Sequence, residues 1–115
     1  MAGRAPQRFL PLPSLSYYVL LALGEGAAHG WAVIKRIREL TDGSANPSSG
    51  SLYLAMVRLE DDGLIAESAT PPGDDERRRY YRLTPLGRDV ARAESQRLER
   101  LVRRARALDL LHEPK

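Results

Sequence analysis

The sequence has no cysteine, few aromatic residues and no long apolar segment. Without cysteine the chain forms neither a disulfide nor a thiolate metal site, and this composition suits a reducing compartment. Because aromatic residues make up only 6% of the chain, leucine, valine, isoleucine and alanine must fill the core. No segment reaches the roughly 18 apolar residues that a membrane-spanning helix needs. We expect a cytoplasmic protein with no membrane partner.

The sequence is also poor in the residues from which active sites are built. Its two histidines, His29 and His112, lie far apart along the chain and form no pattern of metal ligands. It contains neither a phosphate-binding loop nor a glycine-rich nucleotide fingerprint. These absences argue against an enzyme, so we expect no catalytic residue, no metal and no cofactor. We interpret His29 as a structural residue.

The chain does have enough residues for one small domain and a modest excess of positive charge. A length of 115 residues allows a single core. The net charge of +3 and the pI near 9.6 favour a nucleic-acid partner without requiring one. Residues 1–13 contain three prolines and two arginines but no apolar stretch. This composition predicts a flexible N-terminal arm and not a secretion signal.

Apolar patterns predict two helices in the first part of the chain. The first runs from Ser14, the expected N-cap, to about Leu23 and is apolar on nearly every side. A helix of this kind normally packs between other elements, and a partner subunit is a candidate for one of them. The second helix leads from His29 to about Thr41 and has one apolar stripe.

A third helix follows a turn at residues 42–46. Its N-cap is either Asn46, with Pro47 at the first helical position, or Ser48, and the sequence leaves both choices open. Gly63 is placed to end the helix in a left-handed conformation. In a helix-turn-helix the first residues of such a helix reach base edges, and its free backbone amides bind phosphate.

A basic hairpin comes after the third helix. Residues 64–69 and 77–83 are expected to form two strands around a loop of proline, glycine and acidic residues. Alternation along the second strand directs Arg77 and Arg79 to one side and Arg78 to the other. The order of elements predicts an α+β, mostly α fold with a winged helix-turn-helix at residues 14–84. Such a fold presents a helix and a basic wing to the same side of a duplex.

Thr84 and Pro85 then open a long, highly charged helix that we expect to reach about Leu111. At 1.5 Å per residue it would be about 40 Å long, which is more than this small body covers. Its apolar residues recur at three- and four-residue steps, interrupted by Glu94. Residues 85–115 are therefore predicted to be a dimerisation helix and tail, although a helix folded back along its own domain is the alternative. The expected interface comprises Leu15, Tyr18, Ala91, Leu98, Leu101, Ala105 and Leu108.

Several short strings stand in a fixed order and spacing along the chain. They are His29-Gly30-Trp31 with Ile34-Lys35-Arg36, Ser51-Leu52-Tyr53 with Arg58-Leu59-Glu60 and Gly63-Leu64-Ile65, and Arg79-Tyr80-Tyr81-Arg82-Leu83-Thr84 with Gly87. Together these strings resemble the PadR-like transcriptional regulators. The likeness extends from about Leu15 to Leu111 and is closest to the subgroup with a single C-terminal helix. It implies a homodimeric winged helix-turn-helix repressor or activator, often with a small-molecule effector, whose last helix dimerises.

The candidate DNA contacts lie on the third helix, the wing and the start of the second helix. Serine hydroxyls at a helix start bind phosphate, a glycine there permits close approach, and arginines on a wing bind phosphate or enter the minor groove. The alternatives are simple helix capping for the serines and a solvated face for the arginines. The candidates are Ser48, Ser49, Gly50, Ser51, Tyr53, Arg58, Arg77, Arg78, Arg79, Trp31 and Lys35.

Two features depart from what the resemblance implies. The family generally has lysine or arginine where this chain has Val57, so one phosphate contact of the helix is missing. Three acids, Asp74, Asp75 and Glu76, stand at the wing tip, where they either point away from DNA or pair with the wing arginines. A winged-helix module that recruits another protein and binds DNA weakly or not at all is therefore the alternative function.

The resemblance also implies an effector site between two subunits, where some family members stack flat aromatic compounds on aromatic residues of the last helix. This chain has no aromatic residue after Tyr81. The candidate effector contacts are Tyr17, Tyr18 and Leu98, and an aliphatic effector or none is as compatible with them as an aromatic one.

Overall fold

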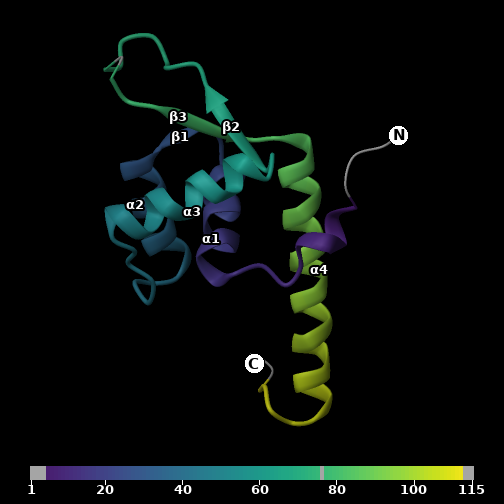
Figure 1. Cartoon of the computed structure of the whole chain (residues 1–115). Coiled ribbons are helices and arrows are strands. Elements are labelled where there is room, and N and C mark those ends of the chain that lie inside the picture. Colours follow the sequence, from purple (N-terminus) through teal and green to yellow (C-terminus); the bar gives the residue numbers. More distant parts are fainter. Residues whose placement is uncertain (1–4, 76, 113–115) are drawn as a thin grey trace.

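The computed structural model describes residues 5–75 and 77–112 and shows a helical body with a small sheet and one projecting helix (Figure 1). No helix among these residues is both long and apolar enough to cross a membrane. The elements, in chain order, are a short 3-10 helix at Pro6–Phe9, α1 at Ser14–Gly24, β1 at Ala28–His29, α2 at Gly30–Leu40, α3 at Ser49–Asp61, β2 at Ile65–Ser68, β3 at Tyr80–Leu83 and α4 at Pro85–Ala107.

Helix α1 lies at the centre of the body. It contacts α2, α3, β3 and α4, which explains why its sequence is apolar on nearly every side. Elements of the same domain thus cover much of the surface of α1 for which we considered contact with a partner subunit. The predicted cap of this helix is wrong, because Pro13 is the N-cap and Ser14 is already helical. The core residues it contributes are Val19, Leu20, Ala22 and Leu23.

The sheet is antiparallel, with strand order β1-β3-β2. Ile65 pairs with Leu83 at the base of the wing, and Ser68 pairs with Tyr80 at its outer end. We did not predict β1, which has two residues, Ala28 and His29, and is too short to show an alternating pattern. It joins the start of α2 to β3, so the wing is attached to the helix-turn-helix.

The turn from the wing into α4 is held by Thr84. Its hydroxyl donates to the Gly63 carbonyl (2.6 Å) and accepts from the Gly87 amide (3.0 Å). Gly63 has a φ of 78° and ends α3 in the left-handed conformation, as predicted. Gly87 packs against the backbone of Leu64 with no room for a side chain. These contacts fix the start of α4 on the end of α3.

The N-terminal segment differs from the flexible arm that we expected over residues 1–13. Residues 6–12 pack against α4, and the Leu12 amide donates to the Glu94 carboxylate (2.9 Å). The physical reason is that Phe9, Leu10 and Leu12 add to the apolar core, and this outweighs the prolines between them. Residues 1–4 lie outside the described part of the chain.

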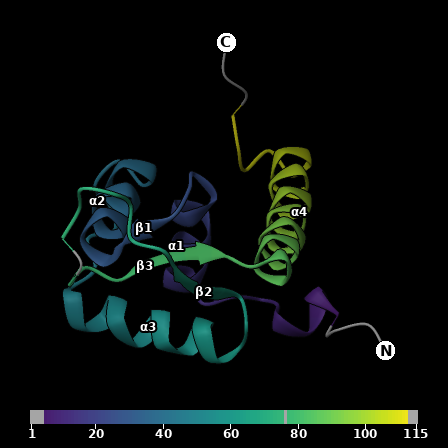
Figure 2. The ribbon, with the colours of Figure 1, turned by 90° about the horizontal axis from the view of Figure 1, so that it is seen from above.

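Helix α4 packs along its first half only. Its buried residues are Gly87, Val90 and Glu94, and from residue 95 onward the helix has none. The second half projects from the body, and Figure 2 shows α4 standing beside it. The helix ends at Ala107 rather than near Leu111, because Asp109 adopts a left-handed φ of 61°. With 23 residues it is about 35 Å long.

The observed fold confirms the predicted class, which is mostly helical with a winged helix-turn-helix and a long last helix. Helix α3 lies along one side of the body, and its outer side is uncovered over its whole length (Figure 2). The wing loop, beyond the outer ends of β2 and β3, lies toward the N-terminal end of α3 (Figures 1 and 2). This arrangement positions the candidate site.

Candidate nucleic-acid interface

Helix α3 begins in a cluster of exposed serines. Ser48 is the N-cap, which settles the choice that the sequence left open: its hydroxyl accepts from the Ser51 amide (3.1 Å) and donates to the Ser51 hydroxyl (3.0 Å). Ser49, Gly50 and Ser51 are exposed. One serine therefore suffices for capping, and the next two amides of the helix start point to solvent without a capping side chain.

Gly50 has no structural requirement to be glycine. It lies in the first turn of α3, and a Cβ at this position would meet nothing within 4 Å. Glycine in a helix lowers stability by about 0.5–1 kcal/mol relative to alanine. Glycine at this position therefore lowers the stability of the helix, although packing does not require it, and it leaves the surface at the helix start open. Both features are expected where a backbone approaches a ligand closely.

A groove of about 380 Å³ runs between α2, α3 and the wing. Trp31, at the start of α2, and Tyr53, in the second turn of α3, line it and remain 68% and 64% exposed. Arg78 and Arg79 line its wing side. The groove therefore brings together candidate residues from three separate parts of the sequence, with aromatic walls and a basic edge.

The wing arginines lie in the loop before β3 and not in the strand. Because β3 begins at Tyr80, our prediction that alternation sorts Arg77, Arg78 and Arg79 onto two faces is wrong. Poor strand formers at residues 71–75 keep the hairpin open here, and the regular pairing stops at Ser68 and Tyr80. The arginines are directed by their ion pairs instead.

Each wing arginine has an acidic partner within the wing. Arg77 pairs with Asp75 (3.1 Å), Arg78 with Asp74 (3.4 Å) and Arg79 with Glu67 (3.7 Å). All three arginine side chains remain more than half exposed, so these pairs are weak and readily exchanged for other anions. Glu76 lies outside the described residues.

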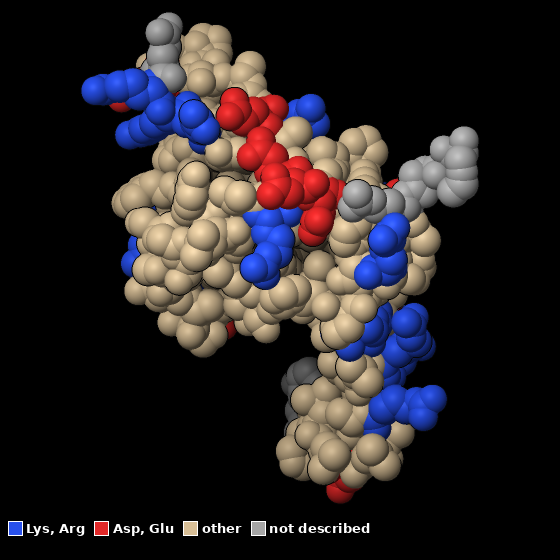
Figure 3. Space-filling view, viewed as in Figure 1, with Lys and Arg blue, Asp and Glu red and all other residues tan. Residues whose placement is uncertain are grey.

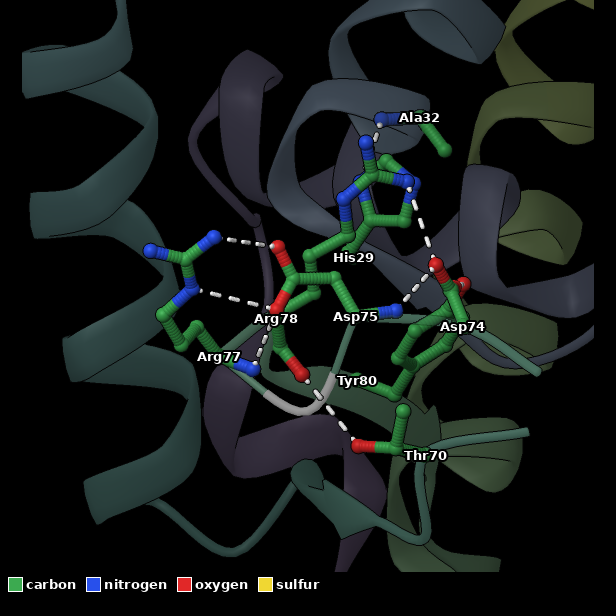
Figure 4. Close-up of polar contacts among 8 residues, drawn as sticks. All are labelled: His29, Ala32, Thr70, Asp74, Asp75, Arg77, Arg78 and Tyr80. Atoms are coloured by element: carbon green, nitrogen blue, oxygen red, sulfur yellow. Dashed lines mark hydrogen bonds and ion pairs between the residues drawn. The ribbon is translucent and has the colours of Figure 1, made fainter. Parts of the chain in front are cut away.

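A polar cluster holds the wing loop against the start of α2 (Figure 4). The Tyr80 hydroxyl donates to Asp74, and the Tyr80 ring packs edge-on against His29 with ring centroids 5.3 Å apart. The hydrogen bond from Tyr80 is the main cause that lowers the pKa of Asp74, and it raises the pKa of Tyr80. His29 caps α2 by accepting from the Ala32 amide (3.3 Å). These contacts fit the structural role that we predicted for His29.

The pKa of Asp75 is also lowered, first by the side chain of Arg77 and then by the backbone amide of Arg77. Asp74 and Asp75 are therefore carboxylates at neutral pH, and they place negative charge beside Arg77 and Arg78 of the wing. Any polyanion that binds the arginines has to compete with them.

Charge is distributed unevenly over the face that carries α3 (Figure 3). Basic side chains gather on the wing loop and along α4, whereas acidic side chains form a band over the C-terminal end of α3 and β2. The sequence of this end is Glu60-Asp61-Asp62. The N-terminal two-thirds of α3 carry no acid and are suited to approach an anionic surface.

The remaining candidate contacts flank this surface. Arg58 is exposed on the side of α3 that faces α1, where it borders a shallow hollow with Leu54 and Leu15. Lys35 is exposed on α2, one turn after Trp31. Our sequence reasoning missed Leu54, which is 68% exposed on the outer side of α3. Its spacing of two positions from the buried residues Leu52 and Met56 was the available signal.

The candidate dimerisation residues fall into two groups. Leu15, Tyr18 and Ala91 are half-buried against the core of their own domain. Those in the second half of α4 and directly after it are more open: Leu101 and Leu108 are exposed, while Leu98 and Ala105 are half-buried. Val102, Leu110 and Leu111 extend the exposed apolar surface at this end.

The candidate effector residues do not surround one cavity. The Tyr17 hydroxyl is hydrogen-bonded to the Ser95 hydroxyl (2.7 Å), Tyr18 packs against the core, and Leu98 lies on α4. A hollow of about 340 Å³ beside Ser95 is lined by residues of α1, α4 and the end of β3. Within the described ranges, no group of three His, Asp or Glu side chains is arranged to hold a metal ion.

The sequence of residues 19–93 matches the family described as the transcriptional regulator PadR-like family. The chain belongs to this family. The match runs from the middle of α1 into the first half of α4 and thus includes the groove, the wing and the turn into α4. Members of the PadR-like family are transcriptional regulators, which agrees with the DNA-binding arrangement described above.

Among solved structures, a transcriptional regulator from Clostridium thermocellum is 29% identical, with a TM-score of 0.61, over 86% of this chain and 90% of the other. A PadR family transcription regulator from hypervirulent Clostridium difficile R20291 is 24% identical, with a TM-score of 0.70, over 84% of this chain and 98% of the other. The second likeness concerns the fold alone.

Among curated proteins, an uncharacterized 37.1 kDa protein in a transposon of Streptomyces fradiae is 36% identical over 83 residues. These residues make up 72% of this chain and 22% of that protein. The PadR-like chain thus spans about a fifth of the length of this relative.

Proposed function

We propose that the protein is a homodimeric transcriptional repressor that binds a near-palindromic operator through α3 and the wing. The observation that carries this proposal is the groove in which Tyr53 of α3, Trp31 of α2 and the arginines Arg78 and Arg79 of the wing meet. The exposed start of α3 lies at the same groove, since Ser49 lines it. A helix start and a cationic loop on one face match the two features that a duplex offers, its major groove and its phosphates.

In this arrangement α3 enters the major groove with its N-terminal end. Ser49, Gly50 and Ser51 then face the backbone, where hydroxyls and amides bind phosphate. The wing arginines exchange their partners Asp74, Asp75 and Glu67 for phosphates, and Lys35 and Arg58 contact the strands on either side. The acidic C-terminal end of α3 stays outside the groove because phosphates repel it.

Dimerisation through α4 is supported by the apolar residues left uncovered on its second half. Leu101 and Leu108 are exposed one below the other, seven positions apart, and Val102 widens the strip. An exposed apolar strip of this kind at the end of a projecting helix is typical of a protein–protein interface. Two copies joined there present two α3 helices, which then read half-sites about one helical turn apart or a multiple of it.

A dimer bound over a promoter excludes other proteins from the same stretch of DNA, which favours repression. A small-molecule effector would act on this arrangement from the hollow beside Ser95, because that hollow lies between α1 of the DNA-binding body and α4. Tyr17 borders the same region through its hydrogen bond to Ser95.

The test is the selection of duplexes from random DNA by the full chain, followed by footprinting and a salt titration. We expect a two-fold symmetric footprint and an affinity that falls with salt at about 0.9 logarithmic units per phosphate neutralised. Arg78→Ala or Arg79→Ala weakens all duplexes and flattens the salt dependence, whereas Tyr53→Ala weakens the selected duplex more than others. A monomer in solution, an asymmetric footprint or no duplex binding in dilute buffer contradicts the proposal.

A second candidate function is a winged-helix module that binds a protein. It is favoured by the apolar outer side of α3, where Leu54 and Val57 are exposed, and by the acidic band beside it. Such a module retains the fold and dimer but shows no steep dependence of duplex binding on salt.

A further inference from the structure

The outer side of α3 is apolar in the middle of the helix. Its buried residues are Leu52, Met56 and Leu59. At 100° per residue, the positions opposite to them are Gly50, Leu54, Val57 and Asp61. We call Leu54 and Val57, which are 68% and 36% exposed, the apolar crest of α3.

The crest limits how α3 reads a base pair. Discrimination by hydrogen bonds relies on arginine, lysine, asparagine, glutamine or an acid placed against the base edges. Between Ser49 and Val57 the helix has none of these residues, and its polar side chains there are hydroxyls only. Leu54 and Val57 offer methyl groups. The apolar partner that a major groove provides is the C5-methyl group of thymine.

Charges on both sides of the crest place it over bases and not over phosphates. Arg58 lies on the flank of α3 that faces α1, and Arg78 and Arg79 lie across the groove on the wing. The acids at residues 60–62 keep the C-terminal end of the helix away from the backbone. A strip with cations on its flanks and methyl groups along its middle is complementary to a groove with phosphates at its edges.

We propose that Leu54 and Val57 recognise thymine methyl groups, so that each operator half-site has thymine at the positions facing the middle of α3. This inference rests on the proposed function, since it requires α3 in the major groove. It adds the chemical basis of sequence preference, in which shape and methyl contact replace bidentate hydrogen bonds.

The experiment uses a duplex selected from random DNA by the full chain and resynthesised with deoxyuridine in place of thymidine. Uracil pairs as thymine does and lacks only the methyl group. Replacement at the α3 positions should weaken binding about fourfold for each methyl lost, the factor for burying one such group. With one methyl in each half-site the loss is about fifteenfold. Deoxyuridine outside the footprint is the control and should leave the affinity unchanged.

Variants identify the protein side of the contact. Val57→Ala and Leu54→Ala remove methyl groups from exposed positions and should reduce the preference for thymine over uracil toward one. Leu40→Ala at the end of α2 is the matched control, because Leu40 is similarly exposed (45%), lies outside both proposed interfaces and should leave the preference unchanged.

Each result decides between the alternatives. Equal affinity for the thymine and uracil duplexes overturns the inference and leaves the proposed function intact. The same result is expected if the crest docks a protein. A preference for thymine that both alanine variants retain in full also overturns it. If the chain selects no duplex at all, both the inference and the proposed function fail.

Discussion

Gly87 lies so close to Leu64 that a Cβ on the glycine would be 1.9 Å from the Leu64 carbonyl oxygen. The amide of Thr84 also donates to this carbonyl (3.1 Å). The first turn of α4 is thus pressed onto the chain that leads from α3 into β2. This contact sets the angle between the helix proposed to dimerise and the helix proposed to bind DNA.

Gly87→Ala should therefore destabilise the protein. The atom that a methyl group would meet is backbone, which cannot rotate away, so the start of α4 has to shift. We expect the free energy of unfolding to fall by at least about 2 kcal/mol, in the range of severe overpacking. Urea denaturation measures it. An unchanged midpoint would show that α4 is not packed against Leu64 as described.

Gly50→Ala is the matched control and a prediction in its own right. A Cβ here meets open space, so the variant should be more stable by about 0.5–1 kcal/mol. Its affinity for the selected duplex should fall, because the added methyl group separates the start of α3 from the DNA backbone. Denaturation and a binding titration on the same variant test both parts. Gain of stability without loss of affinity would remove Gly50 from the interface.

Asp75→Asn should strengthen DNA binding by roughly three- to tenfold, because it frees Arg77 and removes a negative charge from the wing. The control is Asp89→Asn, an exposed acid of α4 that pairs with Arg92 (3.7 Å) and lies outside the wing. Both variants change the net charge equally. Equal effects of the two on duplex affinity, measured at one salt concentration, would mean that the wing tip does not face phosphate.

Glu94→Gln should destabilise the protein at neutral pH and not in acid. The two-pronged hydrogen bonds from Arg97 (2.5 and 3.0 Å) lower the pKa of Glu94, helped by the Leu12 amide. A lowered folded-state pKa gives stability that is full above the ordinary glutamate value of about 4.3 and is lost as the pH falls through the lowered value. We expect a difference of roughly 2 kcal/mol at pH 7.

The control for this change is Glu99→Gln on the same helix. Glu99 pairs with Arg103 at 3.6 Å, and both side chains are well exposed, so the effect should stay below about 0.5 kcal/mol. Unfolding is measured at pH 7 and pH 3 for wild type and both variants. A Glu94→Gln effect that persists undiminished at pH 3 would assign it to packing and not to the charge.

Leu101→Glu should dissociate the proposed dimer. In the proposed assembly each substituted carboxylate lies against the apolar strip of the partner and close to the partner's own carboxylate. We expect this burial and repulsion of charge to weaken association at least about a hundredfold. Sedimentation equilibrium measures the effect. Leu54→Glu introduces the same charge at an exposed leucine of α3 and should leave the oligomeric state unchanged. If both variants remain as associated as wild type, α4 is not the interface.

Regular elements with strong patterns were predictable from the sequence. The helices α1, α2 and α3 end within about two residues of their expected positions, because apolar periodicity and glycine at the end of α3 are local signals. The order of elements predicted that α3 and the basic wing lie on the same face, but it did not place Trp31 beside Tyr53 in the groove between them. The direction of the arginine side chains could not be predicted from the sequence, because their acidic partners and not strand alternation set it.

Features that depend on distant partners were not predictable. Glu94 looked like an interruption of an apolar seam, but it is buried to 2% exposure because the Leu12 amide and Arg97 satisfy it. The N-terminal segment looked flexible because its prolines are a local signal, whereas its packing on α4 depends on residues more than eighty positions away. The end of α4 at Ala107 was likewise not predictable, because no helix-breaking residue marks it in the sequence.

In the proposed dimer, the charge of α4 gives two opposing responses to ionic strength. The helix has a surplus of four positive charges, because Asp89, Glu94 and Glu99 stand against Arg88, Arg92, Arg97, Arg100, Arg103, Arg104 and Arg106. Bringing two such helices together is repulsive, and added electrolyte screens this repulsion. Electrolyte weakens attachment to a duplex at the same time. Operator occupancy at nanomolar protein should therefore pass through a maximum at intermediate salt, so the buffer itself can switch the apparent activity of the molecule.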